Sequence, residues 1–155
     1  MQKRGEKLSF DGFKIRVIEQ RDRDDVLSMM REFYASDAVF TNGSEEIFEK
    51  DIEGCISGSP YLEGYVFEKD NVTVGYSMIA KSYSTEFGKS CIWIEDIFIK
   101  KDYRGQGIGN LFFEYIEREY PNSIFRLEVE KENEIAVALY KKRGFDFLPY
   151  LEMKK

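Results

Sequence analysis

The chain has 155 residues, 43% of them hydrophobic, which is enough for one domain with a buried core. It contains no histidine, and this excludes Ser-His-Asp and Cys-His nucleophile systems and His-rich zinc sites. The formal net charge of −6 argues against a nucleic-acid partner, because phosphate contacts need a basic face. Any acid–base chemistry must use carboxylates, tyrosine, lysine, cysteine or water, and no metal site is expected.

Alternating and helical patterns predict the elements of the N-terminal half. Phe13 to Glu19 alternates apolar and polar residues, which predicts a first strand. Asp22 is expected to cap the amphipathic helix that follows, and Ser44 to begin a second helix with an acidic first turn. Pro60 to Glu68 and Val72 to Tyr83 then resemble the two strands of a hairpin.

The C-terminal half alternates strands and helices. The predicted elements are a strand over Cys91 to Lys100, a helix after the glycine-rich loop at 104–109, a strand over Ile124 to Val129, a helix over Asn133 to Arg143, and a last strand over Phe145 to Met153. Antiparallel hairpins come first and crossovers through helices follow. The fold class is therefore α/β (α+β), with a mixed, mostly antiparallel sheet of six to seven strands flanked by about four helices.

Nothing in the sequence indicates secretion or a membrane. The N-terminal residues MQKRGEKLSF lack the apolar run of a signal peptide, and no apolar stretch approaches the roughly 20 residues that span a bilayer. Cys55 and Cys91 lie far apart without metal-type spacing and are expected to be small buried residues. No repeat or linker divides the chain, so we expect a single domain over residues 1–155, cytoplasmic and without membrane contact.

The segment Tyr103 to Gly109 carries the clearest chemical signal. Its spacing fails the dinucleotide fingerprint and the nucleotide-triphosphate loop, which disfavours a nucleotide-binding domain. Three glycines nevertheless let backbone N–H groups converge at a helix N-terminus, next to the cation of Arg104. The segment is either an anion site or a glycine-rich strand-to-helix turn without a ligand.

An Arg-x-x-Gly-x-Gly pattern after an apolar strand resembles the acyl-CoA pyrophosphate motif of the GCN5-related N-acetyltransferase (GNAT) family, and Arg104, Gly107 and Gly109 fill it. The run IEDIFIKKDYRGQGIG is similar to the spermidine/spermine (polyamine) branch of that family. The resemblance implies the acyl-CoA N-acyltransferase fold, acetyl-CoA as acyl donor and an N-acetyltransferase. It also implies that one loop binds the cofactor's pyrophosphate, namely Arg104, Gly105, Gln106, Gly107, Ile108 and Gly109.

The resemblance further implies that the pantetheine arm of the cofactor lies along the preceding strand. Carried onto this chain, the strand positions are Ile97, Phe98 and Ile99. A strand that separates from its neighbour at a bulge offers unpaired N–H and C=O groups to such an amide-bearing ligand. The other interpretation is an ordinary core strand, and side-chain identity does not separate the two.

Asn133 and Tyr140 are the candidate residues of the last helix. They are seven residues apart, so they lie within about 20° of one helix face and about 10 Å apart along the axis. The resemblance implies that Asn133 binds the pantetheine arm and that Tyr140 protonates the departing CoA thiolate. Asn133 as a helix N-cap and Tyr140 as a core-edge residue remain the plainer interpretations.

The candidate base is Glu95. An alkylamine with a pKa of roughly 10.4 must lose a proton before attack, which costs about 4 to 5 kcal/mol near neutral pH. With no histidine, Glu95 is the first candidate for assisting this loss, directly or through water, and its neighbour Asp96 points to the other strand face unless a bulge reverses the two. A backbone N–H near Ile97 is expected to meet the developing oxyanion.

The acidic residues are unevenly spread. The stretch from Ser36 to Asp70 contains nine acidic and two basic residues and nets −7, which leaves +1 for the rest of the chain. In the family, the second helix and its loops commonly build the acceptor wall, and a negative wall would attract a cationic amine. A solvated acidic helix face is the alternative.

The sequence thus favours an acetyl-CoA-dependent enzyme acting on a primary amine of a small, cationic acceptor in a ternary complex. The alternatives are an acyl-CoA sensor or regulatory module without turnover, and an acetyltransferase acting on a peptide or protein amine. The expected partners are a small-molecule amine and a second copy of the chain, since Phe145 to Met153 is suited to pairing across a homodimer, as in related enzymes.

Overall fold

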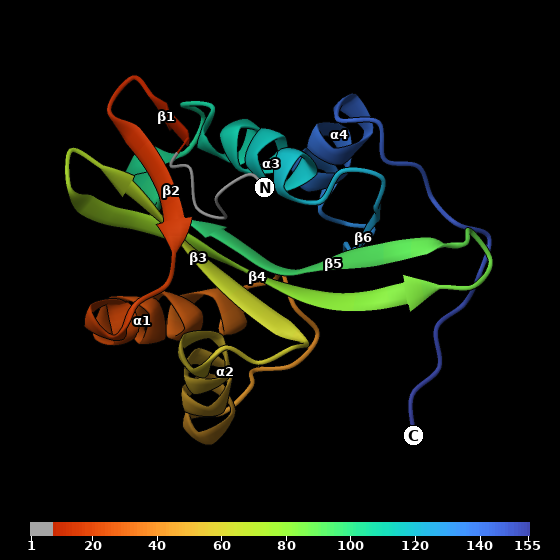
Figure 1. The fold of residues 1–155 in the computed structure, drawn as a ribbon, viewed down its shortest axis with the longest axis horizontal. Coiled ribbons are helices and arrows are strands. Elements are labelled where there is room, and N and C mark those ends of the chain that lie inside the picture. Colours follow the sequence, from red (N-terminus) through yellow and green to blue (C-terminus); the bar gives the residue numbers. More distant parts are fainter. Residues whose placement is uncertain (1–7) are drawn as a thin grey trace.

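The computed structural model describes residues 8–155, which form one sheet covered by helices on both faces (Figure 1). The elements are β1 (Leu8–Phe10), β2 (Phe13–Val17), the 3-10 helix η1 (Gln20–Asp22), α1 (Arg23–Tyr34), α2 (Glu45–Ser57), β3 (Leu62–Lys69), β4 (Val72–Ser84), β5 (Lys89–Ile99), the 3-10 helix η2 (Lys101–Tyr103), α3 (Ile108–Glu119), β6 (Ile124–Leu127) and α4 (Glu134–Lys142).

The strands lie in the order β1-β2-β3-β4-β5-β6, and every neighbouring pair is antiparallel except β5 and β6. The predicted mixed, mostly antiparallel sheet with four α-helices is confirmed. Helices α1 and α2 cover one face, and α3 and α4 cover the other (Figure 1). Each face has its own buried cluster, one centred on Phe67 and Phe112 under α3, the other on Met30 and Ile52 of α1 and α2.

The strands at the two ends of the chain differ from the prediction. Leu8–Phe10 pairs with β2 although its sequence is too short to show a strand pattern. The predicted last strand, Phe145 to Met153, is wrong: this segment has no regular structure and runs past the tip of the β4–β5 hairpin (Figure 1). Pro149 lacks a backbone N–H, and a strand forms only where a neighbour supplies hydrogen bonds. Leu151 and Met153 are 96% exposed.

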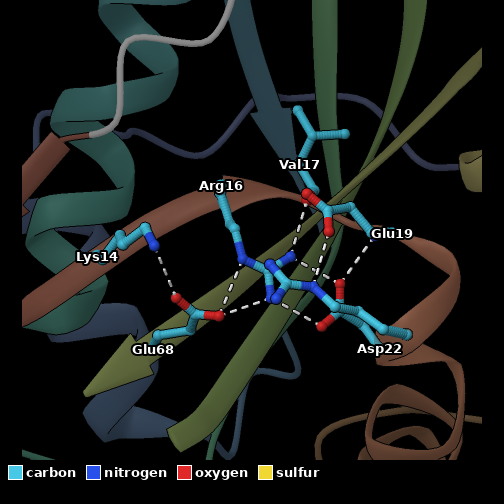
Figure 2. A network of polar contacts seen from close by, with 7 residues as sticks. Lys14, Arg16, Val17, Glu19, Asp22 and Glu68 are labelled. Atoms are coloured by element: carbon cyan, nitrogen blue, oxygen red, sulfur yellow. Dashed lines mark hydrogen bonds and ion pairs between the residues drawn. The ribbon is translucent and has the colours of Figure 1, made fainter. Parts of the chain in front are cut away.

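Side-chain caps begin two of the four α-helices, α2 and α4. Ser44 caps α2, since its hydroxyl accepts a hydrogen bond from the Ile47 N–H at 3.3 Å. Asn133 caps α4 in the same way. Asp22 does precede α1, but the prediction that its side chain caps this helix is wrong. Its carboxylate instead accepts hydrogen bonds from Arg16 and from the Glu19 N–H (Figure 2).

Cys55 and Cys91 are free and buried, as predicted. Among the described residues, no helix is long and apolar enough to span a membrane. The same residues contain no cluster of carboxylate and thiol groups suited to a metal ion.

Candidate functional site

A β-bulge in β5 shapes the centre of the molecule. Met78 of β4 lies opposite Asp96, and the next residue, Ile79, lies opposite Ile94, so Glu95 is the extra residue on β5. The bulge exchanges the two faces of the strand. Before it, Ile94 belongs to the cluster under α3, whereas after it Asp96 and Phe98 are buried on the α1 and α2 side.

Beyond the bulge, β5 leaves its other neighbour. The parallel pairing with β6 extends from Cys91 to Ile94, where Ile94 lies opposite Leu127. In the described chain no strand continues this pairing along Ile97 to Ile99. Apart from the Ile99 carbonyl, which accepts a hydrogen bond from Arg104, the N–H and C=O groups on this edge of β5 are therefore free for a ligand that adds as a strand.

A cleft of about 1010 Å³ opens at this separation. Its lining includes the predicted catalytic residue Tyr140 and six of the ten predicted cofactor residues, contributed by β5, the glycine loop, α3 and the N-terminus of α4: Ile97, Phe98, Ile99, Arg104, Gly109 and Asn133. The other four, Gly105 to Ile108, do not line it. Phe33 at the end of α1 and the loop from Ser36 to Phe40 form the opposite wall. The glycine loop and α4, which are about 30 residues apart in the sequence, thus meet in one cleft.

The glycine loop has the geometry of an anion cradle. Gly105 and Gly107 have φ values of +74° and +87°, and a Cβ atom at either position would meet nothing within 4 Å. Gly107 is the N-cap of α3 and has no capping side chain, so the first N–H groups of the helix keep their hydrogen-bonding capacity. The open space at Gly105 and Gly107 and the N–H donors of α3 therefore lie together at the positive end of the α3 dipole, which suits an anion.

The side chains of this loop differ in role. Arg104 is exposed and donates a 2.7 Å hydrogen bond from Nε to the Ile99 carbonyl, which leaves its terminal nitrogens for an anion. Gln106 is exposed and donates to the Asp102 carbonyl. Ile108 is 1% exposed and belongs to the core, so only its backbone N–H can serve a ligand. Phe98 is likewise a core residue by its side chain.

Helix α4 carries Asn133 and Tyr140 along the cleft. The Asn133 side-chain oxygen accepts a hydrogen bond from the Ala136 N–H at 3.2 Å, so the N-cap interpretation is correct, and the amide NH₂ can still donate to a ligand. Tyr140 packs edge-on against Phe113 and Phe145, each ring centroid 6.0 Å away. Burial raises the pKa of Tyr140, so its hydroxyl keeps its proton at neutral pH.

Glu95 and Asp96 lie in different environments. Glu95 is exposed as a whole residue, but the surrounding chain keeps part of the water away from its carboxyl, and this desolvation, together with the charges of Asp51 and Glu152, raises its pKa. Asp96 is 3% exposed, and both of its oxygens accept hydrogen bonds from tyrosines. Glu95 is not among the described residues that line the cleft of 1010 Å³; it lies at the bulge, two residues before Ile97 of the cleft.

Four of the nine acidic residues in the predicted wall form ion pairs. Glu45, Glu49, Glu63 and Glu68 pair with basic side chains, in the pairs Arg31–Glu45, Arg23–Glu49, Lys81–Glu63, Arg16–Glu68 and Lys14–Glu68. Asp51 on α2 is different: burial raises its pKa. The free negative charge near Glu95 is therefore smaller than the sequence count indicates.

Two carboxylates that no sequence motif marks complete this acidic region. Glu128 follows β6 and Glu152 lies in the C-terminal segment, and both line a second cavity of about 740 Å³ that also reaches Tyr140. A hydrogen bond between the two carboxyl groups, with burial and the charges of Glu152 and Glu95, raises the pKa of Glu128 to about 7. Spacing of 24 residues gives no sequence signal for such a pair.

The model of the acetyltransferase (GNAT) family matches residues 27–145 of the chain, a range that contains the cleft, the glycine loop and α4. The chain belongs to this family. It is an N-acetyltransferase, and members of the family use acetyl-CoA. The resemblance that the sequence shows is therefore confirmed.

Curated relatives and solved structures agree with this membership. The thialysine N-epsilon-acetyltransferase of Sus scrofa is 33% identical over 143 residues, which are 84% of this chain and 82% of the relative. A possible acetyltransferase from Clostridium difficile 630 superposes with a TM-score of 0.78 at 22% identity and covers 92% of this chain and 96% of its own. AAC(6')-Iy in complex with the bisubstrate analogue CoA-S-monomethyl-acetylneamine has a TM-score of 0.71 at 13% identity, with 92% and 97% covered. The two structures share the fold.

Proposed function

We propose that the protein transfers an acetyl group from acetyl-CoA to a primary amine of a small, cationic acceptor, by direct attack in a ternary complex. The observation that carries the proposal is the cleft in which the free edge of β5, the glycine loop and Tyr140 meet. Acetyl-CoA supplies the activated thioester, and the chain's own groups bind it, orient it and move protons.

The groups in and beside the cleft match the successive parts of acetyl-CoA, from the pyrophosphate to the pantetheine arm. The N–H groups at Gly107 to Gly109 and the terminal nitrogens of Arg104 suit a pyrophosphate. The free backbone edge at Ile97 to Ile99 and the Asn133 amide suit the amides of a pantetheine arm. The side chains of Phe98 and Ile108 support the strand and the helix from the core.

Two proton movements are assigned to side chains. Tyr140, whose raised pKa keeps it protonated, donates its proton to the departing thiolate. Glu95, whose raised pKa brings it closer to the working pH than an ordinary glutamate, helps remove the proton from the attacking ammonium, directly or through water. The N–H near Ile97 stabilises the oxyanion between these steps.

A cationic acceptor is favoured by the charges around Glu95. The negative charges of Asp51 and Glu152 raise the pKa of Glu95, and those of Glu152 and Glu95 raise the pKa of Glu128. The relatives named for thialysine act on an amine, which supports an amine acceptor here. We expect acceptors with several positive charges to outcompete amino acids with a free carboxylate, thialysine among them.

The test is release of the free CoA thiol from acetyl-CoA with a panel of amines: diamines and polyamines, amino acids including thialysine, and lysine-containing peptides. Fastest turnover with polycationic amines supports the proposal. Faster reaction with anionic or neutral amines overturns the acceptor class, and fastest reaction with peptides shows an enzyme acting on protein amines. Tight CoA binding, measured by calorimetry, without release for any amine would show a sensor.

We further propose that the chain acts as a homodimer through its C-terminal segment. Phe147, Tyr150, Leu151 and Met153 are exposed on a segment that pairs with no strand among residues 8–155. Isolated apolar side chains are common on surfaces, but a run of them on one extended segment suits a protein contact. Light scattering should give twice the chain mass, and deletion of residues 147–155 should give the monomer; a monomeric full chain at micromolar concentration contradicts this.

A further inference from the structure

Asp96 on β5 is a buried carboxylate to which the proposed chemistry gives no task. It is 3% exposed and lies among the apolar side chains of the α1 and α2 face. Phe98, two residues further along β5 and on the same face, belongs to the hydrophobic cluster there. Burying a carboxylate there is costly unless it is hydrogen-bonded, so its partners indicate why it is retained.

The partners come from two different elements. The Tyr34 hydroxyl, at the end of α1, donates to Oδ1 of Asp96 at 2.8 Å. The Tyr76 hydroxyl, on β4, donates to Oδ2 at 2.9 Å. Ser77 adds a 2.7 Å hydrogen bond from its hydroxyl to the Asp96 backbone carbonyl. Helix, neighbouring strand and β5 are thus joined at one residue.

These contacts hold β5 in place directly after the bulge, at Asp96. Met78 lies opposite Asp96 and Ile79 opposite Ile94, so the change of strand face takes place at Glu95 alone. Asp96 can point toward Tyr34 and Tyr76 only if the extra residue is accommodated directly before it. The inward direction of Asp96 and the outward direction of Glu95 are therefore one geometric feature.

We propose that Asp96 is a positioning residue: the tyrosine pair Tyr34 and Tyr76 fixes its carboxylate, which holds the bulge and thereby sets the direction of Glu95 relative to the acceptor. The inference rests on the proposed function, because it gives Asp96 its effect through Glu95. The same contact ties the end of α1, and with it Phe33 of the cleft wall, to the bulge.

The energetic balance agrees with a role other than stability. Burial raises the pKa of Asp96 to about 6 even though the two tyrosine hydrogen bonds lower it. A raised pKa means that folding disfavours the charged form of the carboxyl group, so the ionised Asp96 lowers the free energy of unfolding. Groups retained at such a cost cluster at functional sites.

The experiment is a double-mutant cycle between the tyrosine pair and Glu95. The Tyr34→Phe/Tyr76→Phe variant removes both hydrogen bonds and keeps the rings. We expect it to lower kcat/KM for the amine about 10- to 100-fold, the effect of misplacing a reacting group by about 1 Å. The dissociation constant of CoA should change less than about twofold, because Ile97 to Ile99 remain paired with β4.

In the Glu95→Gln background the same pair of substitutions should have little further effect, since the residue it positions is already inactive. Losses that multiply across the cycle would show an independent structural role and overturn the inference, leaving the proposed base intact. A Glu95→Gln variant with unchanged turnover would instead overturn the base, and with it any positioning through Glu95.

Tyr65→Phe is the matched control. Tyr65 is also a buried tyrosine that donates to a carboxylate, Glu63, at 2.7 Å, but it faces α3. Its loss should leave kcat/KM within about twofold of the parent. If the tyrosine-pair variant does not fold, as judged by thermal unfolding, the single Tyr34→Phe variant carries the same test, because Tyr34 is half-buried at the end of α1. An unchanged kcat/KM in a folded variant overturns the inference.

Discussion

The guanidinium of Arg16 and the carboxylate of Asp22 form two parallel hydrogen bonds of 2.7 and 2.8 Å, and both side chains are buried (Figure 2). Arg16 also donates to Glu68 on β3, at 2.9 Å from Nε and 2.6 Å from a terminal nitrogen. One cation therefore joins β2, β3 and the residue that precedes α1, and none of the three residues lines the cleft.

Arg16→Met should destabilise the fold by about 3–5 kcal/mol, because it leaves the buried carboxylate of Asp22 without a cation and that of Glu68 with Lys14 alone. Arg16 holds the pKa values of Asp22 and Glu68 below their usual range, so the network stabilises the fold above pH ~4 and loses this effect as the pH falls below it. Denaturant unfolding at pH 7 and pH 3 measures both effects. Arg21→Met, which breaks an exposed pair with Glu19, should cost about 1 kcal/mol or less; an equal cost would contradict the prediction.

Tyr140→Phe should lower kcat about 10²- to 10⁴-fold, the usual contribution of a general acid, while CoA affinity stays nearly unchanged. The ring keeps its packing against Phe113 and Phe145, so the substitution removes only the hydroxyl. Steady-state kinetics and calorimetry with CoA separate the two quantities. Weakened CoA binding with unchanged turnover of bound substrate would make Tyr140 a structural residue.

Gly107→Leu should abolish CoA binding, since its side chain would fill the open space above the N-terminus of α3. A residue other than glycine at a φ of +87° also costs about 1–2 kcal/mol of stability. Gly58→Leu is the control for that cost: Gly58 has a φ of +80°, meets nothing within 4 Å and ends α2. Equal loss of CoA binding in both variants would assign the effect to folding.

The parts of the site that could be predicted from the sequence rest on local signals. The glycine loop, the Ser44 and Asn133 caps and the shared helix face of Asn133 and Tyr140 depend on residues within one or two turns of each other. Such patterns are fixed by backbone geometry and capping chemistry. The sequence leaves undecided whether a bulge changes the strand face between Glu95 and Asp96, because one strand alone does not reveal its register with its neighbour.

The parts that the sequence could not supply depend on distant residues. Tyr34 and Asp96 are 62 positions apart, and their hydrogen bond has no periodicity to reveal it. The ion pairs of the acidic stretch are equally hidden, since the charge count of a segment omits cations such as Lys81 that come from another strand. A last strand is predicted over Phe145 to Met153, yet none of the described strands pairs with this segment.

The pair Glu128 and Glu152 predicts a pH-dependent preference for cationic acceptors. With the pKa of Glu128 near 7, the pair gains a negative charge between pH 6 and pH 8. The KM of a diamine should therefore fall relative to that of a monoamine of equal length with a neutral tail, by up to about fivefold, as expected for a partly exposed ion pair. Because both acceptors lose amine protons alike over this range, a change in the ratio of the two KM values reports the change in charge of the enzyme.

Glu152→Gln removes the hydrogen bond and the charge that raise the pKa of Glu128, so the change in the KM ratio should move to lower pH. Glu46→Gln, which removes the same charge from the exposed first turn of α2, should leave it in place. A ratio that is constant with pH in the parent enzyme would show that the pair does not meet the acceptor.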